Sequence, residues 1–187
     1  MIKLKKIVEE FMIEAIETTP PAPPAIHAQD QEFSPDFIKY IKTVENSILA
    51  GFDKQNKLWF PYEDIAGWHI AYGHKLKETK ISSFEEGISQ KEANALLIHD
   101  LHLAKIRVHD YIRNTYKADI LLSEKQEEML TDFSFSLGGL EKFPKFVDAV
   151  LKEDWDTVKK EYIRSSAGKE LKGRNEAFFN RFYYKYD

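Results

Sequence analysis

The 187-residue sequence contains no cysteine, so disulfide bonds and thiol chemistry are both excluded. Metal sites built on cysteine are excluded with them. The six histidines are scattered, without the His-Glu-x-x-His spacing of a zinc protease. An excess of positive charge is also missing: the formal net charge is −4, which argues against general nucleic-acid binding.

The sequence also lacks any long hydrophobic run, since no stretch approaches the ~20 apolar residues that a membrane-spanning helix needs. Acidic residues at Glu9, Glu10, Glu14 and Glu17 interrupt the apolar residues near the N-terminus, so no secretory signal is predicted. A chain of this length is typical of one domain of ordinary size plus an appendage. Such a domain buries enough surface to fold without disulfide bonds.

The N-terminal part predicts a helix followed by a spacer. In residues 1–17, apolar side chains recur at helical spacing with acidic side chains behind them, which predicts an amphipathic helix. Residues 18–32 are interpreted as a linker, because their prolines favour an extended polyproline II conformation. The helix has three possible roles: docking on another protein, packing on its own domain, or lying on a membrane surface. Its acidic face disfavours the last.

The remaining residues, 33–187, are expected to form one folded domain. Ser34 and Pro35 predict a helix start, the apolar spacing continues through Ile48, and Gly51 is expected to end the helix. From Phe52 to Leu76 the residues have no helical period and predict a small β-sheet.

Two capping boxes follow, Ser89 with Glu92 and Ser123 with Gln126, and each predicts the start of a helix. The first helix is expected to be long. Shorter helices are predicted around 144–152, 155–165 and 174–184. This order predicts an α+β fold with two lobes, a small β-sheet lobe and a helical lobe, joined by the long helix with a cleft between them.

The most informative stretch runs from Ala66 to Leu76, where small and aromatic residues are typical of a tight β-hairpin strand. Glu45 precedes it at the end of a predicted helix. The segment from His69 to His74, His-Ile-Ala-Tyr-Gly-His, resembles the strand Thr-Ile-Gly-Tyr-Gly-His of the phage-type lysozymes (family 24 glycoside hydrolases). In that family a catalytic Glu lies in an apolar helix before the strand. The resemblance extends over roughly residues 34–184.

Cleavage of a glycosidic bond needs a proton donor for the leaving oxygen and help for the developing oxocarbenium ion. The resemblance implies Glu45 as the donor, and apolar neighbours should keep it partly buried with a raised pKa. The second group is open. The family has an Asp nine residues after the Glu, where this sequence has Lys54, with Asp53 one position early. Asp53 is the nearest candidate, Glu63 or Asp64 are alternatives, and a site without a second carboxylate is a further one.

His69 occupies the position of the family's Thr, and an imidazole there could accept a proton from water or act as a nucleophile. We therefore include His69 among the candidate catalytic residues. Tyr72 and Trp68 are candidates for stacking on sugar rings. The resemblance also implies an ion pair between His74 and Asp100 that joins the strand to the long helix and serves stability.

The resemblance implies a muramidase that cleaves the bond between N-acetylmuramic acid and N-acetylglucosamine in peptidoglycan, without a metal or other cofactor. A lytic transglycosylase and an inactive structural component of a phage particle are the alternatives. The expected partners are peptidoglycan and, through residues 1–17, a phage structural protein. The expected location is the phage virion, or the host cytoplasm before release to the cell wall. Basic residues near the C-terminus are interpreted as solvated helix charges: Lys169, Lys172, Arg174 and Arg181.

Overall fold

The computed structural model describes residues 33–64, 66–166 and 169–183. The predicted helix over 1–17 and the linker over 18–32 lie outside these residues, so the division of the chain into three parts stays a prediction. No helix in the described part is long and apolar enough to cross a bilayer.

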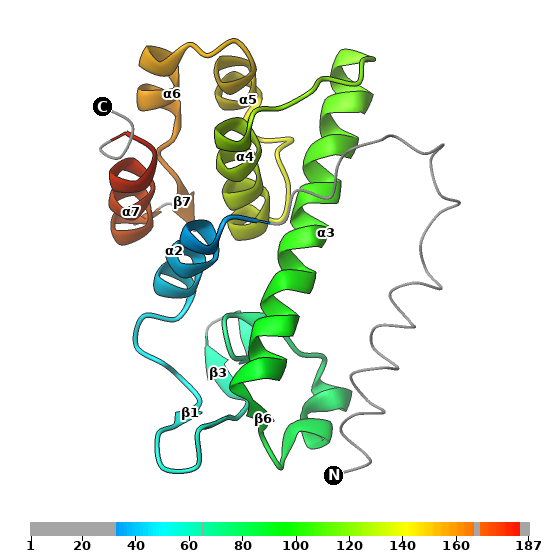
Figure 1. Ribbon diagram of the computed structural model, residues 1–187, viewed down its shortest axis with the longest axis vertical. Helices are drawn as coiled ribbons and strands as arrows, with labels where there is room; N and C mark the ends of the chain where they lie inside the picture. The colour runs from blue at the N-terminus through cyan, green and yellow to red at the C-terminus, as the bar shows by residue number, and fades with distance from the viewer. Residues whose placement is uncertain (1–32, 65, 167–168, 184–187) are drawn as a thin grey trace.

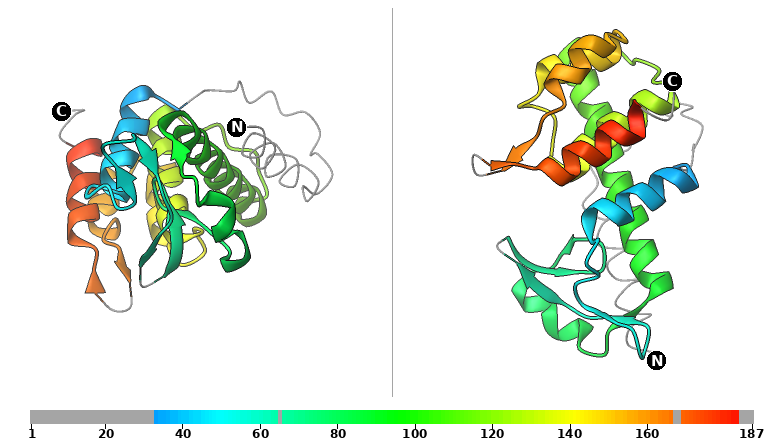
Figure 2. Two further views of the ribbon diagram at one scale, coloured as in Figure 1. Left: turned by 90° about the horizontal axis from the view of Figure 1, so that it is seen from below. Right: turned by 90° about the vertical axis from the view of Figure 1, so that its left-hand side faces the viewer.

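The long helix α3 (Gln90–Tyr116) runs along most of the molecule and joins two lobes (Figure 1). Short strands gather beside its N-terminal half, and the other helices gather beside its C-terminal half, with α2 lying between the two groups (Figure 2). These helices are α2 (Pro35–Glu45), α4 (Glu124–Leu137), α5 (Pro144–Leu151), α6 (Trp155–Glu161) and α7 (Lys172–Phe182), with a 3₁₀ segment η1 (Glu78–Phe84) in the strand lobe. The predicted α+β fold with two lobes is confirmed.

The strand lobe contains two small antiparallel sheets. One has the order β1-β2-β6 and the other β3-β4-β5. In the second sheet His69 pairs with Tyr62 and Ile70 pairs with His74. Because side chains alternate along a strand, buried Ile70 faces the core while His69 and Tyr62 share the opposite face. The strands are β1 (Phe52–Asp53), β2 (Leu58–Trp59), β3 (Tyr62–Asp64), β4 (Gly67–Ile70), β5 (His74–Lys75) and β6 (Ile88–Ser89).

Both predicted capping boxes are present at the helix starts where the sequence indicated them. The Ser89 side chain accepts a hydrogen bond from the backbone N–H of Glu92, whose carboxylate accepts one from the backbone N–H of Ser89. Ser123 and Gln126 make the same reciprocal pair at the start of α4. These bonds satisfy N–H groups that a helix start otherwise leaves without partners.

The first helix is shorter than predicted: α2 ends at Glu45, whereas the apolar spacing indicated a continuation through Ile48. The side chain of Asn46 explains the early end. Its Nδ2 donates to the carbonyl oxygen of Ala50 at 3.0 Å, and its Oδ1 accepts from the backbone N–H of Ala50 at 2.8 Å. Such a side chain offers the backbone an alternative to further helical bonds. Ile48 is consequently 85% exposed.

The predicted helix over 155–165 is also shorter, because α6 ends at Glu161. The chain then forms a two-stranded hairpin, β7 (Ser165–Ser166) and β8 (Lys169–Glu170), that the sequence did not indicate. The hairpin leads directly into α7, so it sets where the first turn of that helix begins.

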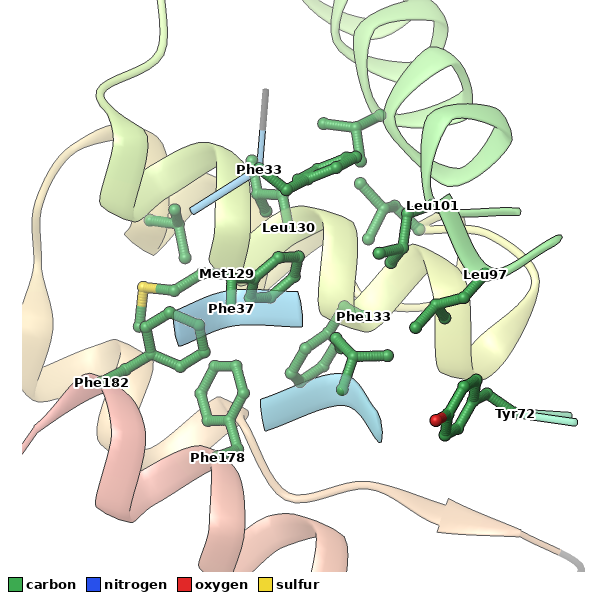
Figure 3. Close-up of a cluster of buried hydrophobic side chains, with 14 of the residues drawn as sticks. Phe33, Phe37, Tyr72, Leu97, Leu101, Met129, Leu130, Phe133, Phe178 and Phe182 are labelled. Atoms are coloured by element: carbon green, nitrogen blue, oxygen red, sulfur yellow. The ribbon is translucent and has the colours of Figure 1, made fainter. Parts of the chain in front are cut away.

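Aromatic side chains form the centre of the helical lobe (Figure 3). Phe133 of α4 stacks on Phe146 of α5 with 3.7 Å between ring centroids, and Phe178 of α7 meets Phe133 edge-on. Phe37 of α2 is fully buried in the same cluster. Burial of this apolar surface holds α2 and α7 against α4.

We expect Ser89→Ala to lower the free energy of unfolding by about 1 kcal/mol, because it removes the hydroxyl that caps α3. Urea denaturation followed by circular dichroism measures the difference. Ser82→Ala, at an exposed serine of the same lobe, is the matched control and should change the free energy of unfolding by less than about 0.5 kcal/mol. Equal losses in the two variants would contradict the assigned role of the cap.

Candidate active site

Glu45, the last residue of α2, lies where the two lobes meet. Its side chain is only 13% exposed, and its Oε1 lies 2.5 Å from Nη2 of Arg174 on α7. On the other side, its Oε2 would lie 3.7 Å from a Cβ placed on Gly73, in the turn between β4 and β5. The carboxyl is therefore enclosed by a helix end, a strand turn and a helix of the opposite lobe.

Burial raises the pKa of Glu45 above its usual value. The charge and hydrogen bonding of Arg174 act in the opposite direction, while the charge of Asp132 raises the pKa further. Desolvation favours the uncharged form of a carboxylic acid, which is the condition that a general acid requires.

Asn46 positions this carboxyl, although the sequence did not single it out. It is 4% exposed, and its Nδ2 donates to the carbonyl oxygen of Ala71 at 2.7 Å. The same side chain bonds the loop at Ala50. Asn46 thus ties the end of α2 to the strand turn that faces Glu45. An Asn directly after a helical acid is the signal that could have indicated this role.

His69 shares a face of the second sheet with Tyr62, its partner across β3 and β4. Its ring lies 6.0 Å from that of Tyr62, and the pKa of Tyr62 is raised by burial and by the charges of Asp64 and Glu45. His69 Nδ1 lies 3.0 Å from the carbonyl oxygen of Gly67 and 3.4 Å from Oδ1 of Asp64. Because a carbonyl can only accept, Nδ1 carries a proton, and in the neutral ring Nε2 has the free lone pair.

Asp53 caps its own turn. Its Oδ1 accepts from the backbone N–H groups of Gln55 at 2.8 Å and Asn56 at 3.3 Å, and its Oδ2 accepts from Nδ2 of Asn56 at 2.6 Å. These hydrogen bonds, led by that from the Asn56 side chain, hold the pKa of Asp53 below its usual value. The two alternatives are in β3, where Glu63 and Asp64 are both exposed.

Tyr72 is placed as a core residue, which argues against the expected stacking on a sugar ring. It is 8% exposed, its ring lies 5.1 Å from that of Trp59, and its hydroxyl accepts a hydrogen bond from Gln90. Trp68 is partly buried and packs against the same core, and its contact with substrate stays a prediction.

His74 of β5 and Asp100 of α3 lie in contact, with Nδ1 and Oδ2 2.8 Å apart. Their side chains are 13% and 21% exposed, respectively. The contact joins the second sheet to the long helix. Its role in stability stays a prediction.

The interpretation of the C-terminal basic residues as solvated charges was wrong for Arg174 and Arg181, which are 14% and 8% exposed. Arg174 faces Glu45, and Arg181 lies 2.5 Å from Oε2 of Glu128. The partners are on α2 and α4, far away in the sequence, so no local pattern could indicate them.

Within the described residues, His, Asp and Glu side chains do not gather in groups of three or more that could hold a metal ion. A pocket of about 600 Å³ lies beside α2 and contains none of the predicted site residues. Its lining residues are Phe33, Ser34, Pro35, Ile38, Lys39 and Lys42.

We expect His74→Ala to lower the free energy of unfolding by about 1–2 kcal/mol, because Asp100 then loses a hydrogen bond in a largely buried setting. Thermal and urea denaturation measure the loss. His99→Ala, one residue before Asp100 on α3, is the matched control and should cost less. A stability change in His74→Ala no larger than in the control would contradict a structural role for the pair.

Comparison with known families gives a match, and comparison with curated proteins finds no significant match. The profile of the family described as Phage lysozyme matches residues 59–176, which is more than half of the chain. The matched region includes His69, His74, Asp100 and Arg174, whereas Glu45 and Asp53 precede it. The chain belongs to the phage lysozyme family.

Proposed function

We propose that this protein is a muramidase that hydrolyses the bond between N-acetylmuramic acid and N-acetylglucosamine in peptidoglycan, with Glu45 as the general acid. The observation that carries the proposal is the position of Glu45. Its largely buried carboxyl ends a helix at the junction of the lobes and faces both a strand turn and Arg174. Membership of the phage lysozyme family supports peptidoglycan hydrolysis in general.

Glu45 begins the reaction protonated and donates its proton to the oxygen of the leaving sugar. Burial supports this protonation by raising the pKa of the carboxyl. Once the proton has moved, the carboxylate carries a full negative charge beside the guanidinium of Arg174. Arg174 therefore stabilises the product form of the acid more than its starting form, which lowers the barrier to proton transfer.

His69 is the group that we propose for activating the attacking water. The carbonyl oxygen of Gly67 and the nearby carboxylate of Asp64 fix Nδ1 as the protonated nitrogen, so Nε2 can accept a proton from water. Asp64 also stabilises the imidazolium that forms. Asp53 is the less favoured candidate, because its carboxylate oxygens already accept three hydrogen bonds within its own turn.

We expect Glu45→Gln to lower the rate of cell-wall hydrolysis by about 10²–10⁴-fold, because the amide cannot donate the proton that the leaving oxygen needs. Clearing of purified peptidoglycan measures the rate. Glu86→Gln, at an exposed acid in the strand lobe, is the matched control and should retain the wild-type rate. Equal clearing by wild type and Glu45→Gln would refute the assignment of the acid.

The clearing assay, repeated at different pH values, gives the pH dependence, and chemical analysis of the released sugars gives the products. Activity should fall as the pH rises through the pKa of Glu45, and because that pKa is raised, activity should persist to higher pH than an ordinary glutamic acid would allow. Hydrolysis leaves a reducing end. A 1,6-anhydro end would instead identify a lytic transglycosylase, and absence of clearing by wild type would support a structural component.

Replacing His69 and Asp53 separately should distinguish the two candidates for water activation. We expect His69→Gln to lower kcat by about 10²-fold or more, since the amide has no basic nitrogen, and Asp53→Asn to lower kcat by less than about tenfold. Steady-state kinetics on soluble wall fragments, with circular dichroism to check folding, measures both. The reverse order of effects would transfer the role to Asp53.

Attachment to a phage structural protein through residues 1–17 stays a prediction from the sequence. The location in a virion, or in the host cytoplasm before release, is a prediction of the same kind.

A further inference from the structure

We propose that Asp132 and Arg164 are positioning residues for the catalytic acid, and that they act on Glu45 through Arg174. This inference rests on the proposed function, because it concerns the group that donates the proton. The two residues form an ion pair with Nη1 of Arg164 2.8 Å from Oδ2 of Asp132, and both side chains are 0% exposed. An ion pair buried this deeply is a poor source of stability, since desolvation of the charges offsets most of their attraction.

Arg164 holds the backbone of Arg174. Its Nη2 donates to the carbonyl oxygen of Arg174 at 3.2 Å, while its Nη1 donates to Asp132 and to Oγ of Ser136 at 3.1 Å. The guanidinium also lies over the ring of Phe133, 4.6 Å from its centroid. One side chain from the loop after α6 thus joins α4 to the first turn of α7.

Asn175 strengthens the same junction. Its Oδ1 accepts from the backbone N–H of Arg164 at 3.0 Å, and its Nδ2 donates to the carbonyl oxygen of Arg164 at 3.1 Å. The residue next to Arg174 is therefore bonded to Arg164 in both directions. These contacts leave the backbone of Arg174 little freedom to move relative to α4.

Asp132 acts on the side chain of Arg174. Its Oδ1 lies 4.0 Å from Nη1 of Arg174, whose Nη2 faces Glu45, so the guanidinium lies between two carboxyl groups. Oδ2 of Asp132 accepts from the hydroxyl of Tyr40 at 3.2 Å. Asp132 therefore competes with Glu45 for the positive charge of Arg174.

The competition determines how readily Glu45 keeps its proton. Arg174 on α7 favours the ionised form of Glu45, and Arg164 acts in the same direction from the loop before β7. Asp132 on α4 disfavours it. On the strand side, the titratable groups of the sheet face that interacts with Glu45 are Tyr62 on β3, which is uncharged near neutral pH and whose pKa burial raises further, and His69 beside it on β4.

Removing one charge at a time should move the pH profile in opposite directions. In Asp132→Asn, no negative charge at position 132 offsets the attraction between Arg174 and the Glu45 carboxylate, so the pKa of Glu45 should fall. The alkaline limb of the activity profile should therefore move to lower pH by about one unit. In Arg164→Gln the negative charge of Asp132 is no longer balanced, so the limb should move to higher pH. Carbon-13 NMR titration of the Glu45 carboxyl should give the same two directions.

The double variant Asp132→Asn/Arg164→Gln removes both charges and avoids an unpaired buried ion. Its alkaline limb should return close to that of wild type. Its kcat should be lower by about tenfold or more with KM unchanged, because the backbone of Arg174 has lost its hydrogen bond. Ser136→Ala removes one hydrogen bond to Arg164 without changing a charge, and as the matched control it should leave the limb in place.

Unchanged alkaline limbs and an unchanged Glu45 titration in both folded single variants would overturn the inference. If the single variants do not fold, the double variant decides, and a wild-type kcat in it would also overturn the inference. The proposed function fails separately, through absence of wall hydrolysis by wild type or full activity of Glu45→Gln. The NMR titration tests the electrostatic coupling in either case.

Discussion

The contact between Glu45 and Arg174 is the one on which the proposed chemistry depends, because it holds the carboxyl beside a positive charge that opposes the effect of burial on its pKa. Its two residues come from α2 and α7, near opposite ends of the described chain. The aromatic core that packs these helices against α4 brings them together and removes the pair from water (Figure 3). Packing of the helical lobe thus sets the electrostatics of a group that faces the strand lobe.

One polar side chain, that of Asn46, fixes the end of the helix that carries the acid. Asn46 ends α2 directly after Glu45 and bonds to Ala71 in the strand turn, so the helix end and the turn are fixed relative to each other. The apolar spacing alone favoured a helix that continues through Ile48, whereas α2 ends at Glu45. The hydrogen bonds of the Asn46 side chain to the backbone of Ala50 outweighed the hydrophobic pattern here, and Ile48 is left exposed.

Asp53 and His69, the two candidates for activating water, differ in how many hydrogen bonds their polar atoms already make. Asp53 is already bonded on both carboxylate oxygens, whereas His69 is bonded at Nδ1 by its own strand and has Nε2 left for chemistry. A base needs a lone pair that no neighbour has engaged. That difference, more than the alignment of either residue with a family pattern, supports His69 as the group that activates water.

Patterns among neighbouring residues correctly predicted the capping boxes at Ser89 and Ser123 and the succession of a first helix, a strand region, a long helix and shorter helices. The stretch from His69 to His74 forms the end of β4, a turn and the start of β5 instead of one strand. Which charges meet depends on the packing of elements that are distant in the sequence. Arg174 looked like a solvated helix residue, and Tyr72 looked like a possible sugar platform, until packing placed the first against Glu45 and buried the second. Capping is local, whereas desolvation and ion pairing depend on side chains brought together from distant parts of the chain.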